Sequence, residues 1–290
     1  MDRWRLSAFG DEVAADLDEQ LAALTAEGIG LVELRSAGSV NVVDMDAAQL
    51  DRAARALEAA GVGVSAIGSP VGKAPIDGDP KAELGRLRAA LDAAERLHTR
   101  LVRVFSFYVP DGRYAEHRDE VLRRMSALAA EAEARGTTLV HENESYIYGD
   151  TAERCRDLIE SVGSPALRVA FDPANFVQCG VRPMTDGWPL LRPYVAHVHI
   201  KDAVTVEREA PYPAPAPEGA LMLSVRPAGE GDGEVRELLR ELARGGYDGI
   251  LTLEPHLHFH LPDQDGSGRL HVAATALRGL VAELDQAPLS

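Results

Sequence analysis

Four residues of the types that bind divalent metal ions stand at the ends of four short apolar runs between positions 137 and 254. They are Glu142, Asp172, His199 and Glu254. A buried run that ends in a carboxylate must either reach the surface there or give that carboxylate a partner. Three carboxylates and one imidazole form a ligand set suited to Mn²⁺, Co²⁺, Mg²⁺ or Zn²⁺.

Each of these residues also has an ordinary structural interpretation. A Glu or Asp directly after a strand is commonly a helix N-cap, and Pro173 supports that interpretation for Asp172. A histidine within an apolar strand is usually a core residue with a hydrogen-bond partner, which is our interpretation of His197. Because all four metal-binding residues fall at successive strand ends, the combination favours a metal site.

These residues need a scaffold that brings distant strand ends together. Short apolar runs alternate with longer amphipathic segments, which is typical of repeated βα units. The predicted strands cover 5–9, 31–34, 62–67, 101–105, 137–141, 167–171, 197–200 and 250–253. The predicted helices cover 16–27, 46–60, 80–97, 114–135, 151–162, 188–194, 234–244 and 269–284. Eight such units predict a single-domain (β/α)8 TIM barrel over residues 1–290, with all strand carboxyl ends on one face.

One segment, residues 204–233, interrupts the βα alternation. Its middle, 210–217, is a run of Ala, Pro and Tyr that can form neither a helix nor a central strand. A loop of this length inside a compact domain is usually functional or mobile. We therefore predict an insertion over the mouth of the barrel.

The composition indicates which kinds of molecule the protein could bind. The formal net charge is −16 and the pI is about 5.0, which argues against binding to a nucleic-acid backbone. Cys155 and Cys179 show no CxxC spacing, and two cysteines are too few for a disulfide framework. The N-terminus lacks the pattern of a signal peptide, and no apolar run is long enough to span a membrane. We expect a soluble, cytoplasmic protein that acts on a small molecule.

Seven motifs spread over nearly the whole chain carry a resemblance to a known family. They are Phe9–Glu12 (FGDE), Val32–Arg35 (VELR), His141–Glu144 (HENE), Phe171–Phe176 (FDPANF), His197–Asp202 (HVHIKD), Pro227–Gly231 (PAGEG) and Leu253–His256 (LEPH). With them, the chain resembles the sugar phosphate isomerase/epimerase superfamily, whose fold is the xylose isomerase-like TIM barrel of the AP endonuclease family 2 type. That group includes ketose 3-epimerases, inosose isomerases and dehydratases, and endonuclease IV.

The resemblance implies a mechanism. Glu142, Asp172, His199 and Glu254 would hold one divalent ion, with Mn²⁺ expected first. Glu142 and Glu254 would lie on opposite sides of a chelated sugar and move a proton α to its carbonyl through an enediolate that the ion stabilises. Return of the proton to the neighbouring carbon gives isomerisation, and return to the opposite face gives epimerisation.

The resemblance also implies contacts to the substrate from four further residues: Arg226, Lys201, His141 and Asn175. Arg226 is matched to a substrate-binding arginine of ketose epimerases, with an exposed loop arginine as the alternative. Lys201 could hold a substrate hydroxyl or phosphate, with an ion pair to Asp202 or Glu230 as the alternative. Relatives suggest a homodimer or homotetramer.

Other functions stay open beside the isomerase or epimerase. The same enediolate could expel a β-substituent, which would make the protein a lyase or dehydratase acting on a keto-glycoside or inosose. A non-enzymatic sugar-binding barrel is the third alternative. The nuclease function is disfavoured, because Ser69, Ser106 and Asn175 stand where endonuclease IV has zinc-binding histidines. Histidines 256, 258 and 260 are interpreted as solvated loop residues, although His256 could reach a metal ligand.

Overall fold

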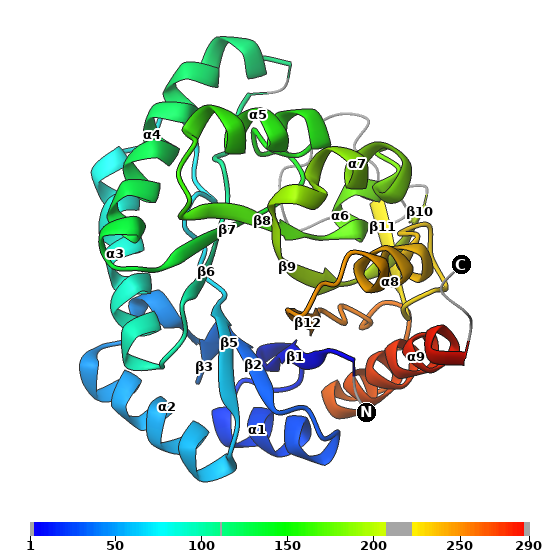
Figure 1. Cartoon of the computed structure of the whole chain (residues 1–290). Helices are drawn as coiled ribbons and strands as arrows, with labels where there is room; N and C mark the ends of the chain where they lie inside the picture. The colour runs from blue at the N-terminus through cyan, green and yellow to red at the C-terminus, as the bar shows by residue number, and fades with distance from the viewer. Residues whose placement is uncertain (1–2, 111, 207–221, 287–290) are drawn as a thin grey trace.

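The computed structural model describes residues 3–110, 112–206 and 222–286. Eight parallel strands close into a barrel in the order β1-β12-β9-β8-β7-β6-β5-β2, which confirms the predicted TIM barrel (Figure 1). The barrel strands are β1 (Arg5–Phe9), β2 (Leu31–Leu34), β5 (Gly63–Ile67), β6 (Leu101–Val104), β7 (Thr138–Glu142), β8 (Leu167–Phe171), β9 (Val195–Ile200) and β12 (Ile250–Leu253).

Helices surround these strands as an outer ring (Figure 1). They are α1 (Leu17–Ala26), α2 (Ala47–Ala60), α3 (Pro80–Arg96), α4 (Tyr114–Ala134), α5 (Ala152–Val162), α6 (Pro173–Gln178), α7 (Trp188–Leu191), α8 (Val235–Arg244) and α9 (Gly266–Gln286). The helix predicted at 188–194 is instead divided between α7 and a 3-10 turn, η4 (Arg192–Tyr194). Pro193 explains the division, because proline lacks the backbone N–H that a continuing helix needs.

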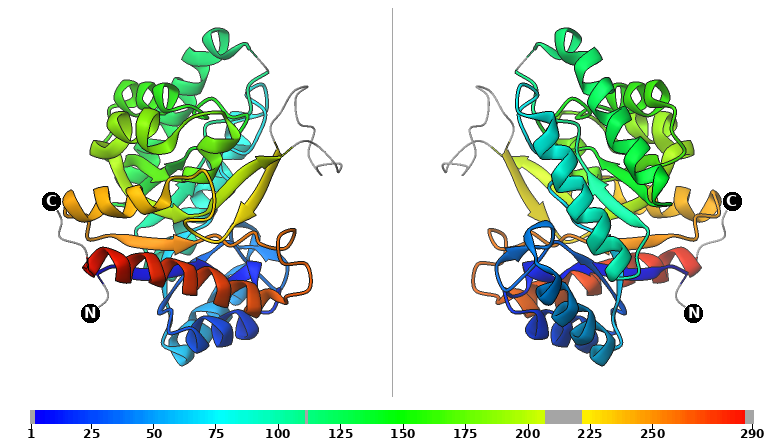
Figure 2. Two further views of the ribbon diagram at one scale, coloured as in Figure 1. Left: turned by 90° about the vertical axis from the view of Figure 1, so that its right-hand side faces the viewer. Right: turned by 90° about the vertical axis from the view of Figure 1, so that its left-hand side faces the viewer.

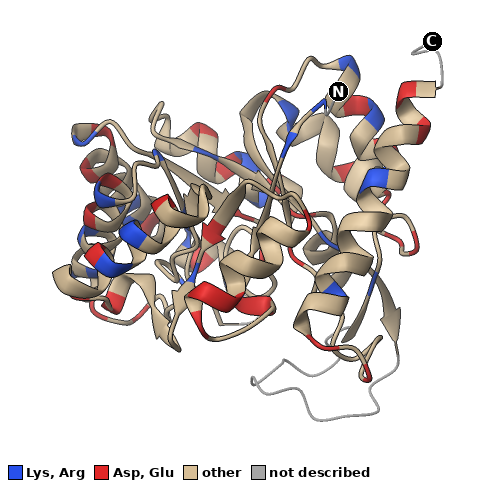
Figure 3. Cartoon of the chain, turned by 90° about the horizontal axis from the view of Figure 1, so that it is seen from below, with Lys and Arg blue, Asp and Glu red and all other residues tan. Residues whose placement is uncertain are grey.

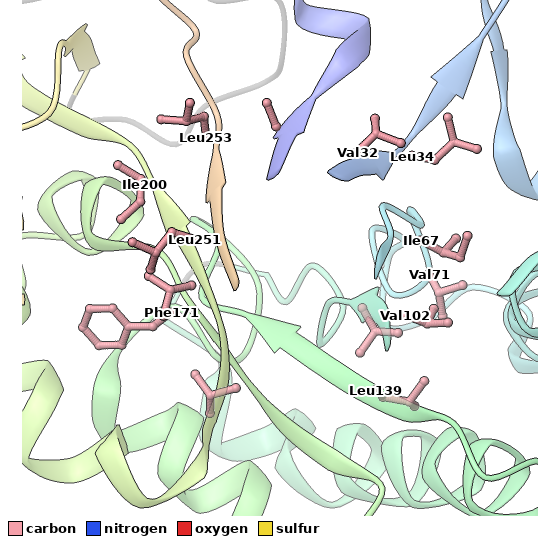
Figure 4. Close-up of a cluster of buried hydrophobic side chains, with 14 of the residues drawn as sticks. Val32, Leu34, Ile67, Val71, Val102, Leu139, Phe171, Ile200, Leu251 and Leu253 are labelled. Carbon is pink, nitrogen blue, oxygen red and sulfur yellow. The ribbon is translucent and has the colours of Figure 1, made fainter. Parts of the chain in front are cut away.

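On several barrel strands the two faces differ in polarity. Apolar, fully buried side chains face outward from the barrel, among them Val32, Val102, Leu139 and Leu251 (Figure 4). Burying one such side chain stabilises the fold by about 1.5 to 3 kcal/mol. Successive strand residues point to opposite faces, so the neighbours of these residues point into the barrel. Buried polar side chains of the inward set are Ser7, Glu33, Ser65, Arg103, His197, His199 and Thr252.

Two short sheets lie outside the barrel: β3 (Ser36–Ala37) with β4 (Val40–Asn41), and β10 (Asp202–Val206) with β11 (Met222–Arg226). The second sheet is an antiparallel hairpin that projects beyond the strand ends (Figure 2). Parts of the predicted 204–233 loop are therefore strands. The Ala, Pro and Tyr run at 210–217 lies outside the described residues.

The surface carries interspersed charges of both signs. Lys and Arg lie among Asp and Glu along the helices in Figure 3, and many form ion pairs, such as Arg118 with Asp157 at 2.6 Å and Arg88 with Glu131 at 3.1 Å. Exposed pairs of this kind contribute little to stability individually. None of the described helices combines the length and the apolar character that a membrane span requires.

The loop after β5 reaches the carboxyl face of the barrel and is held by Gly72. The Gly72 N–H donates to Oε2 of Glu83 over 2.7 Å, and its carbonyl accepts from the N–H of Phe107 over 2.9 Å. Its φ is +85°, a conformation that favours glycine, and a Cβ there would overlap the carbonyl of Phe105. The loop continues into Lys73, so this glycine also helps to place Lys73.

Replacing Gly72 with alanine should therefore destabilise the protein, by about 2 to 4 kcal/mol from backbone strain and overlap together. Gly85 is the matched control, because it is an exposed glycine within α3 and a Cβ added there would meet no atom within 4 Å. Gly85→Ala should stabilise the protein by about 0.5 to 1 kcal/mol. Urea unfolding of both variants measures the difference, and equal stabilities would contradict this account of the loop.

Candidate metal centre

The predicted metal ligands meet at the carboxyl ends of four neighbouring strands. Glu142 ends β7, Asp172 follows β8, His199 lies in β9 and Glu254 follows β12. One ligand atom from each lies within 4.8 Å of the others. Nδ1 of His199 is 3.5 Å from Oε1 of Glu142 and 4.0 Å from both Oδ2 of Asp172 and Oε2 of Glu254. Ligands of one ion at roughly 2.0 to 2.2 Å would be separated by similar distances.

Glu33, on β2, fixes the orientation of His199. Oε2 of this buried carboxylate lies 3.2 Å from Nε2 of His199 and 2.7 Å from Nε2 of His197. Because a carboxylate accepts hydrogen bonds, it favours the His199 tautomer with its proton on Nε2 and turns Nδ1 toward the other ligands. Burial raises the pKa of Glu33, but the two histidines outweigh it and hold that pKa well below its usual value.

Three atoms of the cluster lack hydrogen-bond partners. Oε2 of Glu142, Oδ2 of Asp172 and Nδ1 of His199 are buried and accept no hydrogen bond from the described residues. The other Asp172 oxygen, Oδ1, caps α6 by accepting from the N–H of Asn175 over 2.9 Å, so Asp172 is both a helix cap and part of the cluster. Unsatisfied buried oxygens of this kind fit a cation, and the residues present suit a divalent ion.

Two cationic side chains approach the same carboxylates. Nζ of Lys201 lies 2.8 Å from Oδ2 of Asp172 and 2.9 Å from Oε2 of Glu254. Nη1 of Arg103, which points inward from β6, lies 3.3 Å from Oε2 of Glu142. The alternative partners predicted for Lys201, Asp202 or Glu230, are therefore wrong. Asp202 instead accepts backbone N–H groups of the segment around Gly229 to Gly233.

The remaining oxygen of Glu254 faces a second group of charges. Nε2 of His256 lies 2.8 Å from Oε1 of Glu254, and Nη1 of Arg35 lies 3.7 Å from the same oxygen. Arg35 is itself held by Asp11 at 2.7 Å and by Glu12 at 2.6 Å. His256 is thus part of the site, as the less favoured sequence interpretation allowed, and its left-handed φ of 41° marks a sharp turn after β12.

These neighbouring side chains determine the protonation states of Glu142 and Glu254. Burial raises the pKa of Glu142, but His199 and Arg103 outweigh it and lower the pKa to about 2. Burial likewise raises the pKa of Glu254, but Lys201 and its other neighbours bring that pKa well below its usual value. Both glutamates are therefore ionised at neutral pH, the state that a general base requires.

A cavity of about 330 Å³ opens above the cluster. It is lined by Arg35, Asn41, Gly68, Pro70, Lys73, Arg103, Glu142, Glu144, Asn175, Gln178, Lys201, Leu223, Val225, Glu254, His256, His258 and Phe259. This volume is in the range of small-molecule sites, and the floor of the cavity is polar. Asn175 and Lys201 line the cavity together with Glu142 and Glu254, two of the predicted metal ligands, and their contact with a substrate stays a prediction.

Two other predicted substrate-binding residues do not line that cavity among the described residues. His141 precedes the inward-facing Glu142, so it points outward, where its Nε2 pairs with Oγ of Ser106 at 2.9 Å. Arg226 is partly buried at the end of β11 and donates to the hydroxyl of Ser224. The core role expected for His197 is confirmed, because Glu33 is its partner.

Three residues of the site have no role assigned from the sequence: Glu33, Arg103 and Arg35. Glu33 and Arg103 each interrupt an apolar strand with one charged residue. A single charge between buried apolar neighbours points into the barrel and needs a buried partner, which is the signal that identifies such residues.

Comparison with known proteins identifies the family. Residues 21–270 match the family of the xylose isomerase-like TIM barrel. The chain belongs to this family. A search of the curated proteins found no match.

Similar solved structures share the fold over nearly their full length. The probable 3-DHS dehydratase AsbF of petrobactin synthesis from Bacillus anthracis is 16% identical with a TM-score of 0.74, covering 94% of this chain and 98% of that one. A xylose isomerase-like TIM barrel protein from Mycobacterium smegmatis in complex with magnesium is 16% identical with a TM-score of 0.71, covering 96% and 97%. An L-ribulose 3-epimerase is 17% identical with a TM-score of 0.68, covering 97% and 96%.

The contact between Glu33 and His199 predicts that Glu33 supports metal binding without touching the metal. Glu33→Gln should weaken Mn²⁺ binding by about 10- to 100-fold, because the amide no longer fixes the His199 tautomer. Glu144→Gln is the matched control, since Glu144 lines the cavity but pairs with Lys73 at 2.8 Å. Titration calorimetry measures both affinities, and an unchanged affinity in Glu33→Gln would refute this role.

Replacing Lys201 should have the opposite effect and strengthen metal binding. Its ammonium neutralises two ligand oxygens that a metal ion would use, so the two cations compete for the same carboxylates. Lys201→Met should therefore tighten Mn²⁺ binding on the order of tenfold, or about 1.4 kcal/mol. Lys73→Met serves as control because Lys73 pairs with Glu144 instead. Weaker binding in Lys201→Met, measured by the same calorimetry, would show that Lys201 supports the metal site rather than competing for it.

Proposed function

We propose that this protein is a divalent-metal-dependent isomerase or epimerase of a ketose or keto-sugar. The observation that carries the proposal is the convergence of Glu142, Asp172, His199 and Glu254 in one buried cluster, of which Glu142 and Glu254 line the cavity. Family membership supports it, because similar structures include an L-ribulose 3-epimerase and a D-tagatose 3-epimerase-like protein. The substrate would be a small sugar.

The four residues would hold one ion, with Mn²⁺ proposed first and Co²⁺, Mg²⁺ or Zn²⁺ as alternatives. When bound, the ion would polarise the sugar carbonyl and stabilise the negative charge that develops when an adjacent proton leaves. The magnesium complex of the Mycobacterium smegmatis protein supports a divalent ion of this kind in the family.

The proton transfer falls to the two glutamates. Glu142 and Glu254 belong to strand ends that are separated in the barrel by β8 and β9, so a sugar above the cluster could meet a carboxylate from two directions. One carboxylate would take the proton α to the carbonyl, and the acid so formed or its counterpart would return a proton. Return to the neighbouring carbon gives an aldose–ketose isomerisation, and return to the opposite face gives an epimer.

The neighbouring side chains would hold the sugar and the base in place. Nδ2 of Asn175 donates to Oε1 of Glu142 over 2.9 Å, which orients that carboxylate while the amide lines the cavity. Lys201 has three donor hydrogens and could give one to a substrate oxygen while keeping a carboxylate partner. Arg226 and His141 remain predicted substrate contacts, with no support from the lining of the cavity.

An elimination reaction is the second candidate. The probable dehydratase AsbF has a similar fold, so the family scaffold is compatible with a lyase or dehydratase. The same proton abstraction would then be followed by loss of a β-substituent from a keto-glycoside or inosose. Product analysis separates the two candidates, since only elimination releases a second product.

The two-carboxylate mechanism predicts that Glu142→Gln and Glu254→Gln each lower kcat by at least about 10² to 10⁴-fold, because each removes a group that transfers the proton. The substrates to screen are ketoses, aldoses and keto-glycosides, with each protein saturated with Mn²⁺. Glu144→Gln should keep activity near that of the wild type, because Glu144 faces the cavity outside the cluster.

Metal content provides the control for that experiment. Elemental analysis of the wild type should find one equivalent of a divalent metal, and chelation should abolish activity that Mn²⁺ or Co²⁺ restores. Full activity in metal-free protein would refute the proposed function. A protein that binds sugar and metal but turns over no substrate would favour the sugar-binding alternative.

A further inference from the structure

The cavity above the cluster has an apolar side that the proposed proton transfer does not use. Leu223 and Val225 lie two residues apart on β11, so they face the same way, toward the cavity that both line. They belong to the hairpin, whose partner strand pairs Thr205 with Leu223 and Ala203 with Val225. Both side chains are only partly buried by the described residues.

Phe259 extends this apolar side from the loop after β12. It lines the same cavity and is 74% exposed, the highest value among the exposed large apolar residues that the structure describes. Its ring centre lies 4.1 Å from that of His258, so the two rings form a tilted pair at the cavity edge. A contiguous exposed apolar patch rimmed by polar residues is one mark of a ligand-binding groove.

A free sugar would leave the apolar side of this cavity without a partner. Hydroxyl groups surround a free ketose, and the polar lining, which includes Glu142, Asn175, Lys201 and Glu254, could supply their hydrogen-bond partners. Against Leu223, Val225 and Phe259 the same hydroxyls would lose water without gaining a hydrogen bond. An apolar ring in that position would instead remove both surfaces from water and could stack on Phe259.

We infer that the substrate is a sugar bearing an apolar, ring-containing substituent, which lies along Leu223, Val225 and Phe259 while its sugar ring meets the metal ligands. This inference rests on the proposed function, because it assigns the floor of the cavity to the sugar. It defines an aglycone subsite formed by the hairpin and the loop after β12. A small alkyl glycoside would fill the floor but leave the subsite empty.

The test compares binding of phenyl and methyl glycosides of glucose, galactose, mannose and xylose to the Mn²⁺-loaded full chain. These glycosides lack a keto group for proton abstraction, so titration calorimetry measures binding without turnover. At least one phenyl glycoside should bind about tenfold or more tightly than its methyl counterpart. Phe259→Ser and Leu223→Ser should each remove most of that preference.

Val206→Ser is the matched control. Val206 is an apolar residue of the same hairpin, 41% exposed, and does not line the cavity among the described residues. It should keep the phenyl preference, and thermal unfolding should show that all three variants remain folded. Equal affinities for every phenyl and methyl pair would overturn the inference, as would a preference that survives in both Phe259→Ser and Leu223→Ser.

Two further outcomes separate this inference from its rivals. A dimer that dissociates in Phe259→Ser would show that a second copy of the chain covers these side chains, which would overturn the aglycone subsite. Metal-dependent turnover of free ketoses without any phenyl preference would sustain the proposed function and refute the subsite. A phenyl preference in a Mn²⁺-loaded protein that turns over none of the screened ketoses, aldoses and keto-glycosides would sustain the subsite and refute the proposed isomerase or epimerase.

Discussion

The close approach of three buried carboxylates is the constraint on which the site depends. Glu142, Asp172 and Glu254 place ligand oxygens within 4.8 Å of one another and of His199, where water cannot screen their repulsion. Such a group is stable only with compensating positive charge. Lys201 lies against two of these carboxylates and burial still raises the pKa of Asp172 to about 7, so the compensation by protein side chains is incomplete. A divalent ion would complete it.

The barrel and the four strand ends could be predicted because they depend on local patterns. An apolar run such as Ile250–Leu253 identifies its strand without knowledge of its neighbours, and the strand in the structure has the same bounds. The same alternation, applied one step further, separates Glu142 from His141: adjacent strand residues face opposite sides, so only Glu142 of the two points into the barrel. The resemblance to a family placed His141 in the site, whereas strand geometry turns it toward Ser106.

The supporting contacts could not be predicted, because they join residues whose proximity depends on barrel closure. Glu33 and His197 are 164 positions apart, and their contact requires β2 and β9 to face each other across the interior. The hairpin presents the same difficulty, since β10 and β11 pair across an intervening segment rich in proline. The sequence does indicate that such contacts exist, because one charged residue in an apolar strand, as at Glu33 and Arg103, needs a buried partner.

In the proposed function, the groups that would do chemistry lie on different segments from the groups that would select the substrate. The predicted metal ligands stand at barrel strand ends, whose positions are fixed by eight paired strands. The apolar side of the cavity is formed by β11 and the loop after β12. Asp202, at the base of the hairpin, accepts hydrogen bonds from the N–H groups of Gly229, Gly231 and Gly233. Changes in these outer segments can alter the ligand without moving the cluster. Structures only 16% to 17% identical to this chain keep the same fold while bearing the names of an epimerase and a dehydratase, so the fold alone does not determine the reaction.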